Sequence, residues 1–239
     1  MTRIIESRLQ ELISGGTLAE GSHESFEEGA CAMEWVSYLA GLGFTDAPEC
    51  SSRVLRTYTI SLNDTWNDAD RQRLVPFLPR MVGTAGDGQD EARSYLALDW
   101  LIRTYTPAFL DLANLSAEAQ ALRDLRRIVD MASAEAAGPV VRAGRDKAHA
   151  AWDAAGAAAW DAAWDAARAA AGAAAGDAAR AAAGAAAGDA AGAAARDAAW
   201  AAARDAAWAA LTPTVESLKT SALELLDRMI DPSANEDQA

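Results

Sequence analysis

A run of alanine-rich four-residue units from Trp152 to Leu211 constrains this chain more than any other feature. Two or three of every four positions in the run are alanine, and each unit begins with tryptophan, glycine or arginine. Alanine is the strongest helix former among the amino acids, so we expect the run to be helical. We also expect an all-α fold for the whole chain, because no segment alternates apolar and polar residues as a half-buried strand does.

The length and the period of the run predict that it folds back on itself. A straight helix of its 60 residues would be about 90 Å long, whereas a compact chain of 239 residues is about 45 Å across. A four-residue period also rotates by about 40° per unit around a helix, so that one partner surface cannot follow it. We predict an alanine-rich helical hairpin that turns near residues 176–188.

Tryptophans lie at both ends of the run and glycines near its middle. The hairpin would bring the tryptophans together at a wide end, which would dock on the N-terminal bundle or on the last helix. These tryptophans are the candidate binding residues: Trp152, Trp160, Trp164, Trp200 and Trp208. Glycines spaced four apart, such as Gly172 and Gly176, let two helices approach closely. Self-association through alanine and glycine helix faces is therefore an alternative use of the run.

The rest of the chain predicts a helical bundle, because its apolar residues recur at helical spacing. Helices are expected at 3–14, 22–41, 50–63, 68–74, 88–105, 107–112, 116–137, from 140 into the repeat, and 212–230. Pro76 and Pro79 should break the chain, Gly138-Pro139 should separate two domains, and Thr212 should cap the last helix. The expected organisation is an N-terminal bundle over 1–137, repeat helices over 140–211, a C-terminal helix over 212–231 that packs back, and a frayed tail over 232–239.

The formal net charge of −14 is spread along the chain. An acidic surface repels nucleic-acid phosphates and anionic lipid, so we expect neither nucleic acid nor a membrane as partner. Such a surface either suits a basic protein partner or serves only to keep the protein in solution. Cys31 and Cys50 are too few for a disulfide framework, and the N-terminus lacks the apolar core of a signal peptide. We expect a cytoplasmic protein.

One group of residues has the composition of a metal site. His23, Glu27 and Cys31 recur at a helical spacing of four, and Cys50 from the next helix would complete a His/Cys/Cys/carboxylate set for zinc. The spacing matches no zinc signature. The alternative is structural: the cysteines would be small buried apolar side chains, the acids would complement the helix dipole, and no cofactor would be bound.

Two further patterns suggest a phosphate-handling site. Arg142 and His149 satisfy the loose Arg-x(4–6)-His pattern of HEPN-type ribonucleases, and this resemblance implies an RNA-cleaving site. The acidic surface disfavours RNA, and a solvated helical face is the alternative. The segment from Gly83 to Gly88 lacks the lysine of a phosphate loop, and Asp87 would repel phosphate. We interpret that segment as a connector, and we find no catalytic constellation that predicts an enzyme.

Several stretches of the N-terminal half carry a family resemblance. They include Ser22-His-Glu24, Cys31-Ala-Met-Glu-Trp-Val-Ser-Tyr-Leu-Ala-Gly41, Asp46-Ala-Pro-Glu-Cys50, Leu78-Pro-Arg-Met-Val-Gly-Thr-Ala-Gly-Asp-Gly88 and Asp99-Trp-Leu-Ile-Arg-Thr-Tyr105. Over residues 20–115 the chain resembles a family of uncharacterised all-helical proteins from actinobacteria and actinophages. Its alanine units resemble those of immunity proteins linked to polymorphic toxin systems. Together the two resemblances imply a protein partner. Because the sequence contains no catalytic constellation, we predict a non-enzymatic protein that binds this partner, as an immunity-type inhibitor or an adapter; a structural, self-associating module is the alternative.

Overall fold

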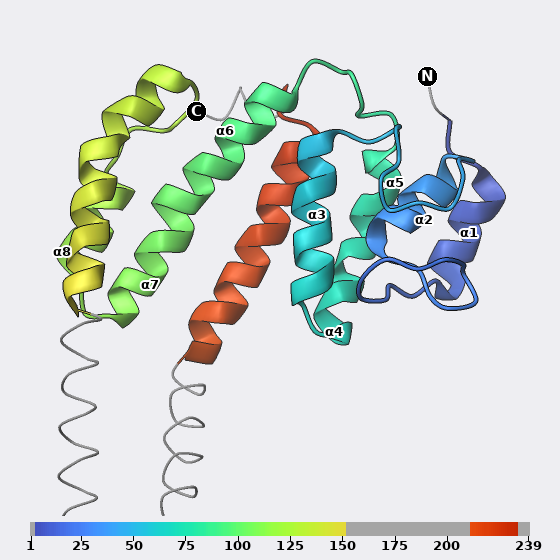
Figure 1. Cartoon of the computed structure of the whole chain (residues 1–239), viewed down its shortest axis with the longest axis horizontal. Coiled ribbons are helices and arrows are strands. Elements are labelled where there is room, and N and C mark those ends of the chain that lie inside the picture. The colour runs from blue at the N-terminus through green and yellow to red at the C-terminus, as the bar shows by residue number, and fades with distance from the viewer. Residues whose placement is uncertain (1–2, 152–210, 234–239) are drawn as a thin grey trace, which may run out of the picture. The chain divides into compact units, whose positions relative to one another are not determined.

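The computed structural model describes residues 3–151 and 211–233, and every regular element in these ranges is a helix (Figure 1). The predicted all-α fold is therefore confirmed for this part of the chain. The alanine-rich hairpin and its tryptophan pairs fall on residues 152–210, outside the described residues. Within the described ranges, no helix combines the length and the apolar character needed to cross a membrane.

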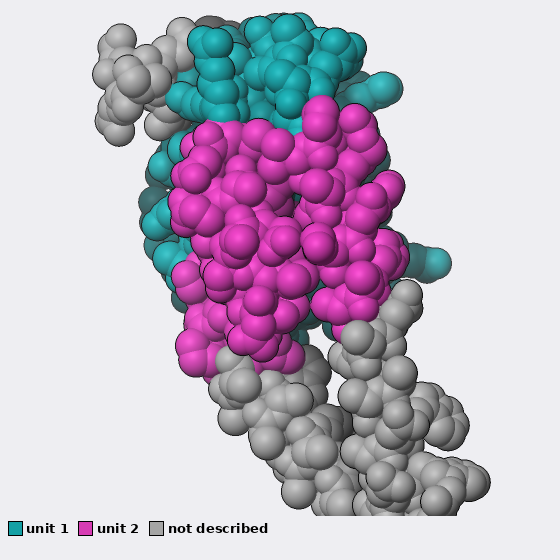
Figure 2. Space-filling view, turned by 90° about the vertical axis from the view of Figure 1, so that its left-hand side faces the viewer, with its two compact units in different colours: residues 1–102, 126–137, 219–239 teal, residues 103–125, 138–218 magenta. Residues whose placement is uncertain are grey.

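The chain divides into two compact units, which Figure 2 draws in separate colours. The first unit contains residues 1–102, 126–137 and 219–239, and the second contains residues 103–125 and 138–218. One boundary between the units lies between Ala137 and Gly138, where the sequence predicts a division. Residues 103–125, which we expected in the N-terminal bundle, group instead with the second unit.

The first unit is a helical bundle that is completed by the end of the chain. Its helices are α1 (Glu6–Gly15), α2 (Ala32–Leu39), α3 (Arg53–Thr65), α4 (Asp68–Arg71), the 3₁₀-helix η1 (Gln72–Phe77), α5 (Leu78–Met81) and α6 (Asp90–Trp100). The helical residues 219–230 lie beside α3 (Figure 1), and the Tyr58 hydroxyl donates to the Ala222 carbonyl at 3.1 Å. Leu225 and Met229 of this helix are fully buried in the same core as α2 and α3. Residues 219–230 thus contribute to the core of the first unit, whereas residues 211–218 group with the second unit.

The second unit contains α7 (Thr106–Leu112), α8 (Ser116–Arg123) and the helical residues 138–151 and 211–218. Asn114 turns the chain between α7 and α8 with a φ of 59°, a left-handed conformation that asparagine tolerates. The next amide, Leu115 N, returns to the Leu110 carbonyl at 2.8 Å and closes the end of α7.

The helix predicted from residue 22 to residue 41 is wrong in its first half. Residues 22–31 form an irregular loop, and α2 begins only at Ala32. Gly29 adopts a φ of 134°, which no right-handed helix contains. Cys31 then caps α2 through its sulfur, which accepts from the Glu34 amide. A local side-chain cap therefore outweighs the apolar spacing that predicted a longer helix.

The helix predicted over residues 116–137 is also wrong, and so is the interruption predicted between that helix and the one from residue 140. The helix α8 ends at Arg123, and a second helix covers residues 131–151 without interruption at Pro139. Asp130 starts this second helix, because its carboxylate accepts from the Ser133 amide at 2.8 Å. The helix loses the hydrogen bond that the missing N–H of Pro139 would have donated, but it continues.

The other prolines shape helices and do not break the chain. Pro76 lies inside η1, and Pro79 occupies the first turn of α5, where a missing N–H costs nothing. Residues Leu101–Tyr105 form a π-helix, η2, directly before α7. Pro107 in the first turn of α7 has no N–H to continue the regular ladder, which accounts for the widened turn before it. At the last helix, Leu211 is already helical, so Thr212 is not its cap.

Arg93 on α6 fastens the end of the C-terminal helix to the first unit. Its side chain is fully buried, and its Nε donates to the Met229 carbonyl at 2.8 Å. The two terminal nitrogens donate to the carboxylate of Asp87 at 2.7 and 2.5 Å, and one also reaches Asp90 at 3.2 Å. A positive charge at the carbonyl end of a helix also complements the helix dipole.

Replacing Arg93 should therefore destabilise the first unit. Arg93→Ala removes the buried cation from two carboxylates and two helix-end carbonyls, and we expect the free energy of unfolding to fall by about 3 kcal/mol in urea titrations. Arg80→Ala is the matched control, because Arg80 pairs with Asp227 across a half-exposed surface and should contribute less than about 1 kcal/mol. Equal losses in the two variants would contradict this assignment.

Two aspartates of the first unit make its stability depend on pH. Hydrogen bonds from the Arg93 guanidinium hold the pKa of Asp87 below its usual range. Burial acts to raise the pKa of Asp70, but hydrogen bonds from Lys219 and Arg73 outweigh burial and lower it. Because both folded pKa values lie below the unfolded value of about 3.9, this stabilisation is complete above about pH 5 and is lost as the pH falls through the folded pKa.

Asp87→Asn tests the sign of this dependence. At pH 7 the variant should unfold at a lower urea concentration than the wild type, because asparagine cannot pair with Arg93. As the pH falls from about 5 to about 2 the wild type loses the same interaction, so the difference between their urea midpoints should shrink. Glu91→Gln on the exposed side of α6 is the control. A difference that stays constant down to the lowest pH would refute the account.

Candidate functional site

Five tryptophans are the binding residues predicted from the sequence. Trp152, Trp160, Trp164, Trp200 and Trp208 all lie outside the described residues. The candidate site is therefore built from the described part of the chain, beginning with the residues of the predicted metal set.

The four residues of that set do not assemble into a zinc site. Because residues 22–31 are not helical, His23, Glu27 and Cys31 do not share a helical face. Glu27 is exposed, whereas Cys31 and Cys50 are buried. Across residues 3–151 and 211–233, no group of three or more His, Cys, Asp and Glu side chains could hold a metal ion.

The structure uses His23 and Cys31 around a buried carboxylate, that of Glu34. The Glu34 side chain is only 1% exposed. Its carboxylate accepts from the amides of His23 and Cys31, both at 2.7 Å, and His23 Nδ1 lies 3.0 Å from Oε2. The Cys31 sulfur in turn accepts from the Glu34 amide at 3.5 Å, which completes a capping box at the start of α2. These contacts attach the preceding loop to α2.

Neither cysteine is suited to nucleophilic chemistry. Burial raises the pKa of the Cys31 thiol to about 12, and the nearby Glu34 carboxylate adds to the shift. Burial also raises the pKa of the Cys50 thiol. Because the thiolate is the reactive form, both side chains are protonated and unreactive at neutral pH. The alternative interpretation of the cysteines as small buried side chains agrees with their surroundings.

The two phosphate-related patterns occupy different environments. Arg142 and His149 are both exposed on the helix over residues 131–151, two turns apart, and the ribonuclease interpretation stays a prediction. The segment Gly83 to Gly88 connects α5 to α6. Asp87 in this segment is bound to Arg93, and Thr84 accepts from the Ser52 amide at 3.0 Å. The side chains of Thr84 and Asp87 thus stabilise the fold through contacts within the first unit.

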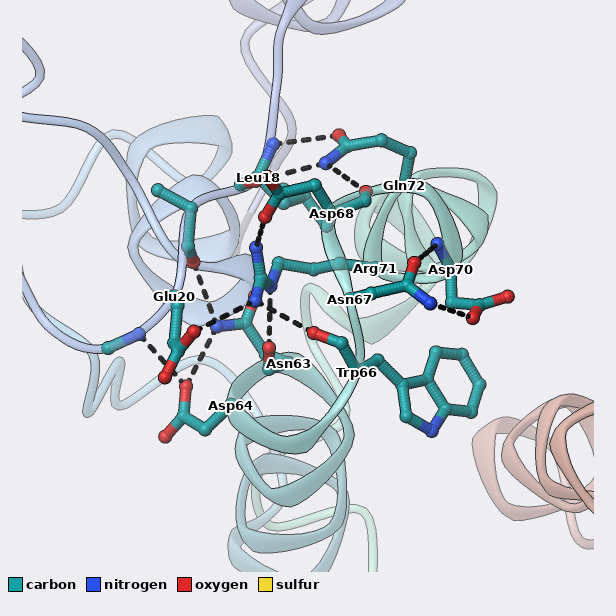
Figure 3. A network of polar contacts seen from close by, with 12 residues as sticks. Leu18, Glu20, Asn63, Asp64, Trp66, Asn67, Asp68, Asp70, Arg71 and Gln72 are labelled. Atoms are coloured by element: carbon teal, nitrogen blue, oxygen red, sulfur yellow. Dashed lines mark hydrogen bonds and ion pairs between the residues drawn. The ribbon is translucent and has the colours of Figure 1, made fainter. Parts of the chain in front are cut away.

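A polar network of the first unit surrounds Arg71 (Figure 3). The Arg71 side chain is 2% exposed. Nε donates to the Asn63 carbonyl at 2.6 Å, and Nη2 donates to the Trp66 carbonyl at 2.8 Å, at the C-terminal end of α3. Nη1 donates to Asp68 at 2.6 Å, and Nη2 also lies 3.4 Å from Glu20. This arginine closes the end of α3 and contacts the loop that carries Glu20.

That loop, residues 17–31, is called the acidic loop here because Glu20, Glu24, Glu27 and Glu28 lie on it. Side chains of α3 and η1 hold its backbone, and the pairs are Gln72 with Leu18 at 2.8 and 2.9 Å, Asn63 with Ala19 at 2.9 Å, and Asp64 with Gly21 at 3.0 Å. With the bonds to Glu34, the loop is fixed at both ends and near its middle. It is irregular in shape but extensively hydrogen-bonded.

The acidic loop presents an aromatic side chain, Phe26. Its ring packs at centroid distances of 5.0 Å from Trp35, 4.5 Å from Tyr38 and 4.8 Å from Phe44. The Trp35 indole is itself fixed, because its nitrogen donates to the Thr17 carbonyl at 3.0 Å. Phe26 nevertheless stays 38% exposed. The structure thus holds the Phe26 ring against three other aromatic side chains while more than a third of the residue stays exposed.

Exposed glutamates lie next to Phe26 in the chain. Glu24, Glu27 and Glu28 lie within two residues of Phe26 and are exposed. A fourth carboxylate comes from α1, where Glu11 accepts from the Tyr38 hydroxyl at 2.9 Å and raises the pKa of that hydroxyl. We call Phe26 with these four carboxylates the Phe26 surface. It is the candidate functional site.

The sequence interpretation missed most of this arrangement. It predicted a helix through Phe26, and it gave no role to Asn63 or Arg71. One signal was available: Cys31 and Glu34 have the three-residue spacing of a capping box, with Gly29 just before them. That spacing predicts that the helix begins at Ala32 and that residues 22–31 form a loop.

Comparison with known proteins assigns no relative. No family model, no curated protein and no solved structure matches the chain. The resemblance drawn from the sequence therefore stays a prediction.

Glu34→Gln tests whether the buried carboxylate organises the acidic loop. Glutamine offers one acceptor oxygen where the carboxylate offers two, so buried donors from His23 and Cys31 lose a partner. We expect the free energy of unfolding to fall by about 2–3 kcal/mol in urea titrations. Glu27→Gln, at an exposed position of the same loop, should change it by less than about 0.5 kcal/mol. Equal stability of Glu34→Gln and the wild type would show that the carboxylate is dispensable.

Proposed function

We propose that this chain is a non-enzymatic helical protein-interaction protein, acting as an adapter or an immunity-type inhibitor, and that it binds its partner through the Phe26 surface. The observation that carries the proposal is the 38% exposure of Phe26 within a cluster of fixed aromatic rings. Aromatic side chains supply a large contact area at a small cost in conformational entropy, and they are frequent at the centres of protein interfaces.

Preorganisation of the acidic loop supports the same function. Binding to a mobile loop requires that the loop be ordered, and this cost reduces affinity. Here Glu34, Asn63 and Gln72 already hold the loop backbone through hydrogen bonds. A partner would therefore meet Phe26 in a fixed position.

The roles of the buried charged side chains also favour binding over catalysis. Glu34, Arg71 and Arg93 are the side chains whose charge and burial would first suggest an active site. Each is bonded to helix-end or loop groups of its own unit. Their partners are structural, and the open residues of the Phe26 surface are carboxylates and an aromatic ring.

A self-associating module is the second candidate, and one observation favours it. Phe109 and Leu112 on α7 are each 38% exposed. They lie three residues apart and thus on one side of the helix. A second copy that covered this face would bury both side chains. The crosslinking experiment described next separates the two candidates.

Site-specific photo-crosslinking tests the proposed function. A benzoylphenylalanine is placed at Phe26, at Phe109 or at the exposed Thr57 as control, and irradiated in cells that naturally encode the chain. The adducts are identified by mass spectrometry. We expect a discrete adduct with another protein from position 26 and none from position 57. A self-adduct from position 109 alone would favour the second candidate, and the absence of any protein adduct from position 26 would refute the first.

A further inference from the structure

We infer that the Phe26 surface takes a basic segment of its partner protein, one in which lysine or arginine side chains flank an apolar side chain. The inference rests on the proposed function and adds the chemistry of the partner. It follows from the distribution of charge in the sequence, from the exposed glutamates that neighbour Phe26 in the chain, and from the partial exposure of Phe26 itself.

The negative charge is concentrated in one stretch of the chain. Residues 9–52 contain eight acidic residues and no lysine or arginine, which gives this stretch a charge of −8. The remaining residues contain 27 acidic and 21 basic side chains, a net charge of −6 for more than four times the length. The acidity thus extends along the chain, as expected from the sequence, but it is densest in this stretch. The Phe26 surface lies within the acidic stretch.

The carboxylates around Phe26 are available to a partner. Chain connectivity keeps Glu24, Glu27 and Glu28 within about 8 Å of the Phe26 backbone, and all three are exposed. The Glu28 carboxylate accepts from the Glu24 amide at 3.3 Å, which orients it without neutralising it. In the described part of the chain, none of these three carboxylates forms an ion pair with lysine or arginine.

The basic side chains near the Phe26 surface, Arg8 and His23, already contact groups of their own unit. The Arg8 guanidinium lies 4.2 Å from the centre of the Tyr38 ring and donates to the Tyr38 carbonyl at 2.7 Å. His23 contacts the buried carboxylate of Glu34, so its ring is directed to the interior of the loop. Arg8 offsets one of the four carboxylates of the Phe26 surface, and the surface stays negative.

These features select among the classes of partner. Carboxylates attract the ammonium and guanidinium groups of lysine and arginine and repel phosphate, so nucleic acid and anionic lipid do not fit. A second copy would bring another −8 stretch against the first. The exposed part of Phe26 adds a requirement for apolar contact. A basic segment with an apolar side chain meets both requirements.

Fluorescence anisotropy with defined peptides tests the inference on the full chain. The probe is a fluorescein-labelled peptide of repeated Lys-Lys-Leu-Lys units. One comparison peptide has serine in place of leucine, and another has glutamate in place of lysine. Two triple variants with the same charge change are compared: Glu24→Gln with Glu27→Gln and Glu28→Gln at the site, and Glu91→Gln with Glu135→Gln and Glu224→Gln at exposed positions elsewhere. Circular dichroism checks that each variant is folded.

We expect the Lys-Lys-Leu-Lys probe to bind the wild type and the control triple variant with affinities within about twofold of each other. The site triple variant should bind it about tenfold more weakly, and Phe26→Ala should reduce the preference for leucine over serine. Equal weakening by both triple variants would show attraction to net charge alone and would overturn the inference. Failure of the probe to bind the wild type would also overturn it. If position 26 still crosslinked to another protein, the proposed function would stand while the partner's basic character would be refuted.

Discussion

The buried carboxylate of Glu34 is the interaction on which the candidate site depends. A carboxylate with 1% exposure is stable only when donors replace its lost water. The donors available are the amides of His23 and Cys31 and the His23 ring, and all three belong to the acidic loop or its end. Satisfying this charge therefore fixes the path of a segment that has no helix of its own. The hydrogen bonds that the buried Glu34 requires therefore determine the conformation of the exposed loop that carries Phe26.

Buried charged groups also determine the local structure at two helix ends in the first unit. Arg71 closes the carbonyl end of α3, and Arg93 closes the carbonyl end of the helix that finishes at Ile230. Each guanidinium is buried, so each is matched by carbonyls and carboxylates. Arg71 also contacts the acidic loop through Glu20, whereas Arg93 joins residues that are 136 positions apart in the chain. The bundle is thus completed by the last segment of the sequence.

Apolar periodicity predicted the helical class and much of the bundle, because burial of an apolar stripe is a local property of the sequence. It identified α1, α3, α6 and the C-terminal helix with its buried Leu225 and Met229. It failed at residues 22–31, where a glycine with positive φ and a capping box override the spacing. It could not predict the Phe26 surface, because the rings of Trp35, Tyr38 and Phe44 meet Phe26 only through tertiary contacts. The burial of Cys31 and Cys50 could be predicted from residue type, because a free cysteine behaves as a small apolar side chain.

The central claim is that the acidic loop is ordered in the free protein, so that Phe26 is presented in a fixed position. Amide hydrogen exchange of the isolated chain measures this directly. The amides of Leu18, Gly21, His23 and Cys31 donate to side chains in the structure, so their exchange should be slowed to an extent comparable with the amides inside α2. Exchange of these four amides at the rate of an unstructured chain, while α2 and α3 remain protected, would contradict the claim.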